Sequence, residues 1–344
     1  MEDLKTFEEL INEDKIYLTN LLFGNGFSIN FGSKFMYSNL FEEAKELLVE
    51  EDISLFGDLD TTNFEYVLRI LGISINTNRI FNIDFEPIEN SYQRIKDALI
   101  ETVRKVHPEP HELTFEQDND LKTTFRLFQE KVFTTNYDLL AYWALNKVNG
   151  VSRKVADGFG YDRDSEMIIF GAGPGVPPKE NPIRLYHLHG SLHLYMDKGE
   201  IIKITTRRNP IGKIDLPLLH TITETYESGY FPLYISEGTW KQKLNNILNN
   251  KYLSFCYDAL IKTSKGLTIY GQSLDKDSDK HIIDAIKHSA IQKIAYGIYD
   301  VSNSTRIIRE VREHFEDSSI ELVFFDAGNF FESMRNIEMD ELFK

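Results

Sequence analysis

The chain has 344 residues, of which 42% are hydrophobic and 12% aromatic, so it can bury a large core and is not a disordered polypeptide. Its 38 basic and 54 acidic residues give a net charge of −16, which argues against a broad surface for nucleic acid or anionic membranes. The only cysteine, Cys256, excludes an internal disulfide and a four-cysteine zinc site. The N-terminus lacks an apolar signal core, and no apolar run reaches the roughly 18 residues that span a bilayer. We therefore expect a soluble, cytoplasmic protein without a membrane partner.

The first 50 residues are expected to hold a helix over 1–15, a strand over 16–23, and a helix whose apolar face begins at Leu40. A glycine turn with Gly24 and Gly26 follows the strand directly. Glycines let backbone N–H groups approach an anion closely, and a helix N-terminus adds positive partial charge. The order of strand, glycine turn and helix therefore indicates a phosphate-binding turn, with an ordinary βα turn as the alternative.

Residues 51–130 are expected to be mostly helical, with a break at 107–110, where two prolines stand. We interpret this region as a helical insertion. A compact strand at 131–134 is followed by a polar stretch and then by a helix over 139–148.

Residues 150–250 are expected to contain short strands and loops. The sequence predicts a turn at 157–162, a Gly/Pro-rich loop over 171–182, and a hairpin around Asp197-Lys198-Gly199. The remaining expected elements are a strand at 167–170, a strand at 183–188, an apolar strand over 231–236 and, after Glu237-Gly238, a polar helix. We interpret 196–250 as a second insertion.

The rest of the chain alternates helices and strands, which favours a parallel sheet with helices on both faces. The expected helices cover 254–263, 281–290 and 304–315, and the expected strands cover 266–270, 293–299 and 320–325. The predicted fold is α/β: a Rossmann-like, doubly wound parallel sheet with helical insertions, forming a single domain over 1–344. Its expected core comprises residues 16–50, 131–150, 183–195 and 252–330.

Four polar clusters follow predicted strands directly. They are Gly24–Ser28, Thr134–Asp138, His189–Ser191 and Gly271–Leu274. Because the carboxyl ends of parallel strands share one edge of a sheet, we expect these clusters to converge on one crevice.

Individual residues in these clusters have competing interpretations. Asp138 fits a helix cap as well as a functional site, whereas Asn136 is harder to explain as a cap. The glycine that follows His189 is expected to leave its ring open to a cleft. His187 competes for the same role, because strand alternation places positions 187 and 189 on one face. The turn at Gly271–Ser273 is either a plain turn or a second contact for a sugar or phosphate.

Several familiar sites are excluded by their missing residues. The dinucleotide fingerprint of dehydrogenases requires glycine at position 29, where Ile29 stands. No GKS or GKT phosphate loop, HExxH helix or cysteine–histidine metal spacing occurs, and no GxSxG elbow surrounds Ser191 or another serine. We therefore expect no metal cofactor.

The segments GNGFS, TTNYD, LHGS and GQSL occur in the order of the sirtuin-type set, which consists of a GAG-x-S phosphate loop, a TQN-x-D strand end, a histidine–glycine pair and a GTS or GSL turn. The chain resembles the SIR2-like NAD hydrolases of bacterial anti-phage defence. The segments SEGTWKQKLNNILNNKYLSF and IYGQSLDKDSDKHIIDAI look like those of a little-characterised bacterial group with a SIR2-like core. The resemblance covers the core strands and much of 184–300, and it is weaker over 51–130.

The resemblance implies that NAD is the substrate and that its nicotinamide–ribose bond is hydrolysed. Asn136 would position the attacking water beside the nicotinamide ribose, and His189 would act as the base. The residues implied to contact NAD are Gly24, Asn25, Gly26, Ser28, Thr135, Asp138, Gly271 and Ser273. NAD-dependent ADP-ribosyl transfer or deacylation, and binding of NAD or ADP-ribose by a regulatory subunit without turnover, stay open as alternatives. The choice between NAD and NADP also stays open.

The chain departs from the sirtuin set at three places: the change at Asn25 is modest, because that loop works through its backbone, whereas the other two losses disfavour deacylation. Asn25 replaces the usual alanine, and Lys34-Phe35-Met36 stands near where sirtuins carry an aspartate–phenylalanine–arginine run. The sirtuin zinc module, which helps to form the acyl-peptide cleft, cannot be built with one cysteine. These losses are typical of the NAD-cleaving branch.

An unrestrained NAD hydrolase is toxic to its own cell. We therefore expect control by homo-oligomerisation or by a partner sensor or regulatory protein encoded nearby, as in abortive infection. Residues 51–130 and 196–250 are the candidate contact surfaces.

Overall fold

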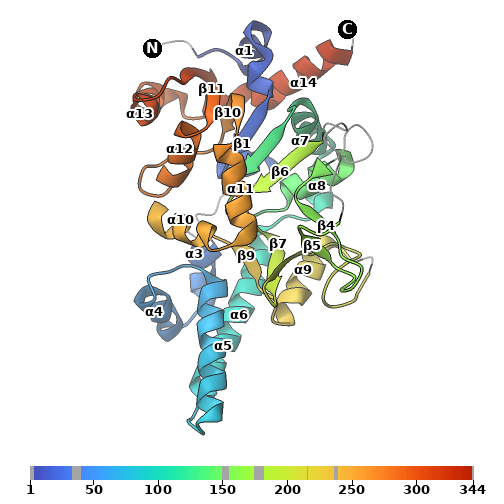
Figure 1. Cartoon of the computed structure of the whole chain (residues 1–344), viewed down its shortest axis with the longest axis vertical. Helices are drawn as coiled ribbons and strands as arrows, with labels where there is room; N and C mark the ends of the chain where they lie inside the picture. The colour runs from blue at the N-terminus through green and yellow to red at the C-terminus, as the bar shows by residue number, and fades with distance from the viewer. Residues whose placement is uncertain are drawn as a thin grey trace.

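Seven parallel strands form the central sheet, in the order β12-β11-β10-β1-β2-β6-β3 (Figure 1). The computed structural model describes residues 4–32, 40–148, 155–173, 182–214, 216–235 and 239–342. The strand bounds are Asn20–Phe23 (β1), Lys131–Thr134 (β2), Val155–Ala156 (β3), Ile183–His187 (β6), Ser264–Tyr270 (β10), Ala290–Ile298 (β11) and Glu321–Asp326 (β12). The predicted α/β class with a doubly wound parallel sheet is confirmed.

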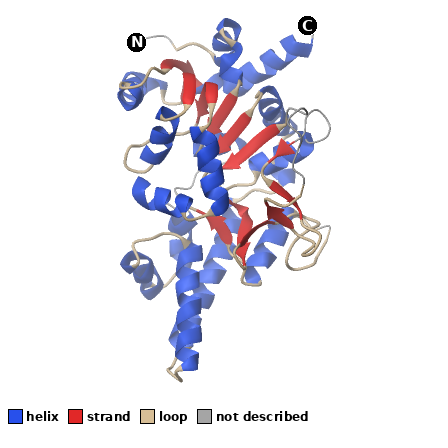
Figure 2. Cartoon of the chain, viewed as in Figure 1, coloured by secondary structure: helices blue, strands red, loops and turns tan. Residues whose placement is uncertain are grey.

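Helices cover both faces of this sheet (Figure 2). Leu21 and Phe23 of β1 pack into one apolar cluster, whereas Leu22 between them packs into the other, as strand alternation requires. The first cluster draws on α1 (Phe7–Glu13), α7 (Phe115–Leu127), α8 (Leu140–Val148) and α14 (Phe330–Leu342). The second draws on α10 (Trp240–Leu248), α11 (Lys251–Ile261), α12 (Lys280–Lys287) and α13 (Ser304–Phe315). Burial on both faces explains why β1 is a continuous apolar run.

The first strand begins later than predicted. Residues Lys15–Leu18 form a 3-10 helix, because the side chain of Asp14 accepts a hydrogen bond from the backbone N–H of Ile16 at 3.0 Å. The C-terminal helix α14 was not predicted at all. Three predicted features lie outside the described residues: Lys34-Phe35-Met36, most of the Gly/Pro-rich loop (174–181) and Glu237-Gly238.

A second sheet of five antiparallel strands lies beside the first, in the order β4-β5-β8-β7-β9. The predicted hairpin around Asp197-Lys198-Gly199 is confirmed as the β7–β8 pair. The strands predicted at 167–170 and 231–236 are confirmed as β5 and β9, whereas β4, inside the predicted turn at 157–162, and the pairing of these strands into one sheet were not predicted. Because β7 begins at Gly190, part of the expected core range 183–195 lies in this sheet. The bounds are Phe159–Tyr161 (β4), Ile168–Phe170 (β5), Gly190–Asp197 (β7), Glu200–Lys203 (β8) and Pro232–Tyr234 (β9).

Residues 51–130 are mostly helical, as predicted. Figure 1 shows α5 (Phe64–Ile80) and α6 (Glu86–Val106) as a long antiparallel pair that projects away from the sheets, and we call this pair the helical arm. The shorter helices before it are α3 (Leu40–Ala44) and α4 (Glu50–Asp58). None of the helices among the described residues is long and apolar enough to cross a bilayer.

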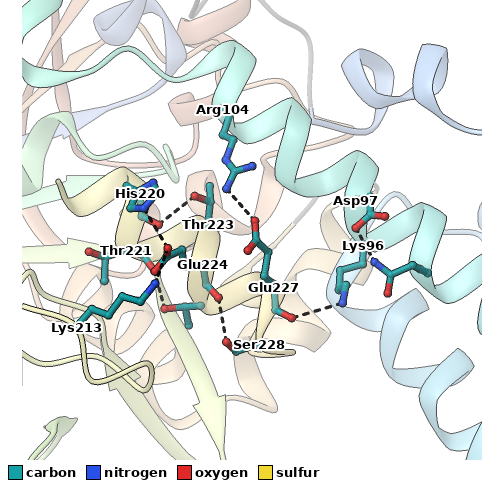
Figure 3. A network of polar contacts seen from close by, with 12 residues as sticks. Lys96, Asp97, Arg104, Lys213, His220, Thr221, Thr223, Glu224, Glu227 and Ser228 are labelled. Atoms are coloured by element: carbon teal, nitrogen blue, oxygen red, sulfur yellow. Dashed lines mark hydrogen bonds and ion pairs between the residues drawn. The ribbon is translucent and has the colours of Figure 1, made fainter. Parts of the chain in front are cut away.

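The base of the arm is tied to the second insertion through α9 (Leu218–Glu227), a helix that the sequence analysis missed. Figure 3 shows Arg104 of α6 reaching the carboxylate of Glu227, with Nη2 and Oε1 2.9 Å apart. The Nζ of Lys96 also donates to the backbone carbonyl of Glu227 at 3.5 Å. These contacts place both insertions on the same side of the molecule.

Candidate functional site

The four predicted clusters follow four adjacent strands of the large sheet, β10, β1, β2 and β6. The strand ends are level with one another, since Phe23 pairs with both Tyr270 and Thr134, and Thr134 pairs with His187. The structure therefore brings the four clusters to one edge of the sheet. The chain reverses its direction of progress across the sheet between β1 and β10, which is where ligands bind in open α/β sheets.

The first and last turns at this edge touch through their backbones. The N–H of Gly24 donates to the carbonyl of Tyr270 at 3.2 Å, and the N–H of Gly26 donates to the carbonyl of Gly271 at 2.9 Å. A Cβ at position 26 would lie 2.7 Å from the Cα of Gly271, which itself has a φ of +65°. The glycines are thus needed for the close approach of the two turns. Two of the N–H groups that were expected to meet an anion have protein acceptors instead.

Ser28, Asn136 and Asp138 form a buried polar cluster that joins the first turn to the end of β2. The hydroxyl of Ser28 donates to Asp138 Oδ2 at 2.5 Å, and Asn136 Nδ2 donates to Ser28 Oγ at 2.8 Å and to the carbonyl of Gly24 at 2.9 Å. Asp138 Oδ1 also accepts from the backbone N–H of Leu140, at the start of α8, at 2.9 Å. Asp138 therefore caps α8 and also holds the side chain of Ser28. Burial raises the pKa of its carboxyl group, against the opposing effect of these hydrogen bonds.

The side-chain amide of Asn136 is only partly used by this cluster. Both of its hydrogen bonds are donated by Nδ2, and its Oδ1 has no hydrogen-bond partner among the described residues. Oδ1 is therefore an acceptor available for a water molecule or a sugar hydroxyl.

A second polar chain crosses the same edge. Thr135 Oγ1 donates to Gln272 Oε1 at 2.6 Å, and Gln272 Nε2 donates to Asp279 Oδ2 at 2.7 Å. Lys243 Nζ lies 3.5 Å from the other carboxylate oxygen of Asp279. Burial raises the pKa of Asp279, while Lys243 opposes that shift. The sequence analysis assigned no role to Gln272, Asp279 or Lys243, although all three stand inside segments that carry the resemblance.

His189 does not open to a cleft, contrary to prediction. Its side chain is buried, and its Nε2 lies 3.0 Å from the Nε2 of His281, a residue that the sequence analysis also missed. Gly190 has a φ of +80°, and a Cβ there would overlap the carbonyl of Leu233 in β9. This glycine therefore allows β7 and β9 to approach each other and does not expose the histidine. Burial lowers the pKa of His189 well below its usual value, with His281 and Lys243 adding to the effect, so the ring is neutral at pH 7.

His187 and His189 have different surroundings. The strand β6 ends at His187, so the alternation that was expected to place both on one face does not extend to position 189. The ring of His187 meets that of His193 at 5.4 Å between centroids, and His193 Nδ1 lies 2.8 Å from Ser191 Oγ. Burial lowers the pKa of His187 to about 4. His187 thus belongs to a second buried cluster, which meets the first at the backbone of Asn136.

Metal ligands are not grouped in the described part of the chain. No set of three or more histidine, cysteine, aspartate or glutamate side chains there is arranged to hold a metal ion.

Comparison with known proteins gives one family and a similarity to one solved structure. A family model described as "Domain of unknown function (DUF4917)" matches residues 21–330. The chain is also similar to a solved structure described as "Structural Basis for the Mechanism and Regulation of Sir2 Enzymes", at 12% identity and a TM-score of 0.39, over 96% of this chain and 99% of that chain. None of the curated proteins matches the chain.

Proposed function

We propose that this chain, which belongs to the DUF4917 family, hydrolyses the nicotinamide–ribose bond of NAD to give nicotinamide and ADP-ribose. The observation that carries the proposal is the Ser28–Asn136–Asp138 cluster, which ties the first glycine turn to the end of β2 at the edge where four polar clusters meet. The order of those clusters along the chain, which resembles the sirtuin-type set, supports NAD as the substrate.

The reaction needs positioning more than acid catalysis. The bond between C1′ of the ribose and the nicotinamide nitrogen breaks, its electron pair goes to the cationic ring, and an oxocarbenium-like ribose is left. The oxygen of a water molecule then bonds to C1′, and one of its protons passes to a base and on to solvent. Because the leaving group is already cationic, no general acid has to protonate it. Holding the dinucleotide and the water in place is the main task of the protein.

We assign the water-positioning role to Asn136, because its Oδ1 is an available acceptor held in place by the two hydrogen bonds of Nδ2. Asp138 keeps Ser28, and through it Asn136, in position. His189 is the proposed base: its ring is neutral, and its Nδ1 has no hydrogen-bond partner among the described residues. Such a base contributes on the order of 10²–10⁴-fold to the rate.

The diphosphate is assigned to the two turns that pack on each other. Asn25 and Ser273 are exposed polar residues on these turns, beside Ser28 and the glycines at 24, 26 and 271. Thr135, which is held by Gln272, completes the proposed NAD contacts. No metal ion is part of the proposed reaction.

The test is nicotinamide release from NAD, and separately from NADP, by the purified chain, with and without lysate of phage-infected bacteria. We expect Asn136→Ala and His189→Ala each to lower the rate at least ~10²-fold while circular dichroism shows wild-type folding. Undiminished activity in both variants refutes the assignment. Adding an acylated peptide separates hydrolysis from deacylation or ADP-ribosyl transfer, in which the peptide is modified.

One observation favours a second candidate, a regulatory subunit that binds NAD or ADP-ribose without turnover. The side chain of the proposed base is buried and engaged with His281. Tight NAD binding in calorimetry with no nicotinamide released, even at high protein concentration and with infected lysate, supports this candidate and contradicts the hydrolase.

We further propose that the hydrolase serves anti-phage defence by depleting NAD, and that homo-oligomerisation or a regulatory partner restrains it. The proposed contact surfaces are residues 51–130, whose helical arm projects away from the sheets, and the second insertion, 196–250, which is tied to the base of that arm through α9. Light scattering of the chain alone, with NAD, and with infected lysate tests this restraint: a monomer in all three conditions, active without any addition, contradicts it.

A further inference from the structure

His189 and His281 form a buried pair of imidazoles at the strand-end site. Their Nε2 atoms are 3.0 Å apart, and their rings lie nearly parallel, with an interplanar angle of 26° and centroids 5.2 Å apart. The two side chains are 5% and 0% exposed, so the contact is shielded from bulk water. A buried hydrogen bond of this kind fixes both the orientation of a ring and the position of its hydrogen.

The backbone at His281 is anchored, whereas Nδ1 of its ring is buried with no hydrogen-bond partner among the described residues, so His189 is the hydrogen-bond partner of the ring. His281 stands in the first turn of α12, and its backbone carbonyl accepts a hydrogen bond from the hydroxyl of Tyr257 in α11 at 3.0 Å. The residue that precedes this helix, Asp279, is anchored by Gln272 and Lys243. The start of α12 is therefore a fixed backbone position from which the ring of His281 reaches His189.

The chemistry of the pair then restricts His189. Two imidazole nitrogens at 3.0 Å share one hydrogen, so one ring donates and the other accepts. Because Nε2 of His189 faces His281, Nδ1 is the nitrogen left for a water molecule. A neutral ring has an unprotonated Nδ1 only if its hydrogen is on Nε2.

We propose that His281 is a positioning residue that accepts a hydrogen bond from Nε2–H of His189 and thereby keeps Nδ1 of His189 unprotonated, ready to take a proton from the attacking water. This inference rests on the proposed NAD hydrolysis. It adds to that reaction a residue that stands 92 positions beyond the base in the sequence.

The charged and titratable groups around the pair are Lys243 of α10, Asp279 ahead of α12, and Tyr257 of α11. Burial lowers the pKa of His281 to about 3, with Lys243 adding to the effect. His281 in turn lowers the pKa of His189. Removing the imidazole at 281 is therefore expected to raise the pKa of His189 and to move the acid limb of the pH–rate profile to higher pH.

The first experiment compares His281→Phe with His281→Gln. We expect His281→Phe to lower kcat at least ~10-fold and to displace the acid limb of kcat/KM, whereas His281→Gln, whose Oε1 can still accept, retains more activity. The matched control is His288→Gln, at the exposed end of the same helix, which leaves rate and profile unchanged. A His281→Phe enzyme with the wild-type rate and pH profile overturns the proposal.

The second experiment does not depend on turnover. Nitrogen-15 NMR of histidine-labelled protein, with the His189 signals assigned through His189→Gln, reports which ring nitrogen carries the hydrogen. We expect an Nε2–H tautomer of His189 in the wild type that is lost in His281→Phe; an Nδ1–H tautomer in the wild type overturns the proposal. Wild-type protein that releases no nicotinamide refutes the hydrolase, while the tautomer still decides whether His281 is the acceptor.

Discussion

The strand-end site and the helical arm use polar side chains in opposite ways. At the strand ends, Ser28 and Asp138 are 110 positions apart in the sequence, and their hydrogen bond is buried. At the arm, Arg104 and Glu227 are joined by an ion pair whose side chains are 47% and 51% exposed. An exposed ion pair contributes little to the free energy of unfolding. A buried polar group that loses its hydrogen-bond partner lowers the free energy of unfolding by the full desolvation penalty of that group. The site is therefore where single polar substitutions are expected to matter.

The largest effect is expected from Gly271→Ala, because a Cβ at 271 would overlap the backbone of Phe27 and lie 2.7 Å from the Cα of Gly26. We expect a loss of more than about 3 kcal/mol in the free energy of unfolding, measured by urea titration. The matched control is Gly212→Ala, which has nearly the same φ of +66° but open space around it, and should cost only about 1 kcal/mol. Equal losses in the two variants would show that the turns at the site do not pack as described.

A pH dependence of stability is expected from the buried histidines. The pKa of His187 is about 4 in the folded chain and 6.5 when unfolded, so between these values the unfolded state binds more protons. Above pH 6.5 this group does not change the free energy of unfolding. As the pH falls from 6.5 toward 4, that free energy decreases, by up to about 3 kcal/mol in all.

The raised pKa of Asp138 acts in the opposite direction, because above pH 3.8 the folded state binds more protons at this group than the unfolded state does, so stability falls as the pH rises. The informative measurement is therefore the difference between wild type and His187→Gln in the pH slope of the unfolding free energy. We expect a shallower slope for His187→Gln and the wild-type slope for the exposed control His288→Gln. An unchanged slope in His187→Gln contradicts the buried, neutral state of this ring.

A smaller effect is expected from Ser28→Ala, which leaves Asp138 Oδ2 and Asn136 Nδ2 without their shared partner. We expect a loss of about 1–3 kcal/mol, read from thermal or urea unfolding. The control is Ser165→Ala, which removes an equivalent bond, Ser165 Oγ to Asp162 Oδ2 at 2.7 Å, from the surface and should cost less than about 0.5 kcal/mol. If both substitutions lower the free energy of unfolding equally, the hydrogen bond of Ser28 is no more important for stability than the exposed one of Ser165.

The smallest effect is expected from Arg104→Ala at the base of the arm. Its exposed pair with Glu227 should contribute about 0–1 kcal/mol and weaken further at high salt, and nicotinamide release should not change. Arg94→Ala on the same helix is the matched contrast, because its partner Asp52 is buried and would keep a charge without its cation. The comparison fails if Arg104→Ala is the more destabilising of the two.

Much of the large sheet could be predicted because its signals are local. Each core strand is an apolar run closed by a polar or glycine turn, and the rule that parallel strands share their carboxyl edge was enough to expect convergence of the four clusters. The antiparallel sheet could not be predicted in the same way. Its hairpin and the strands at β5 and β9 were expected, but no local signal shows that they pair into one sheet, and the three residues of β4 are too few for alternation to show.

Contacts between distant segments also escaped the sequence analysis. Nothing near His281 indicates that its ring meets His189, and Gly26 looks like an anion-binding glycine until its neighbour Gly271 is known. Likewise, the apolar pattern at 16–18 reads as strand, but Asp14 caps a 3-10 helix there. Pairing across ninety or more residues depends on topology, which a local pattern does not carry.

The place of β1 in the sheet has a consequence for how the molecule is made. Its two neighbours are β2 and β10, and β10 ends at Tyr270, near the far end of the chain. A ribosome adds about 5–20 residues per second, so it makes the turn after β10 on the order of ten seconds or more after the glycine turn that follows β1. A nascent chain therefore cannot assemble the strand-end site early, and translation itself delays the appearance of whatever activity resides there.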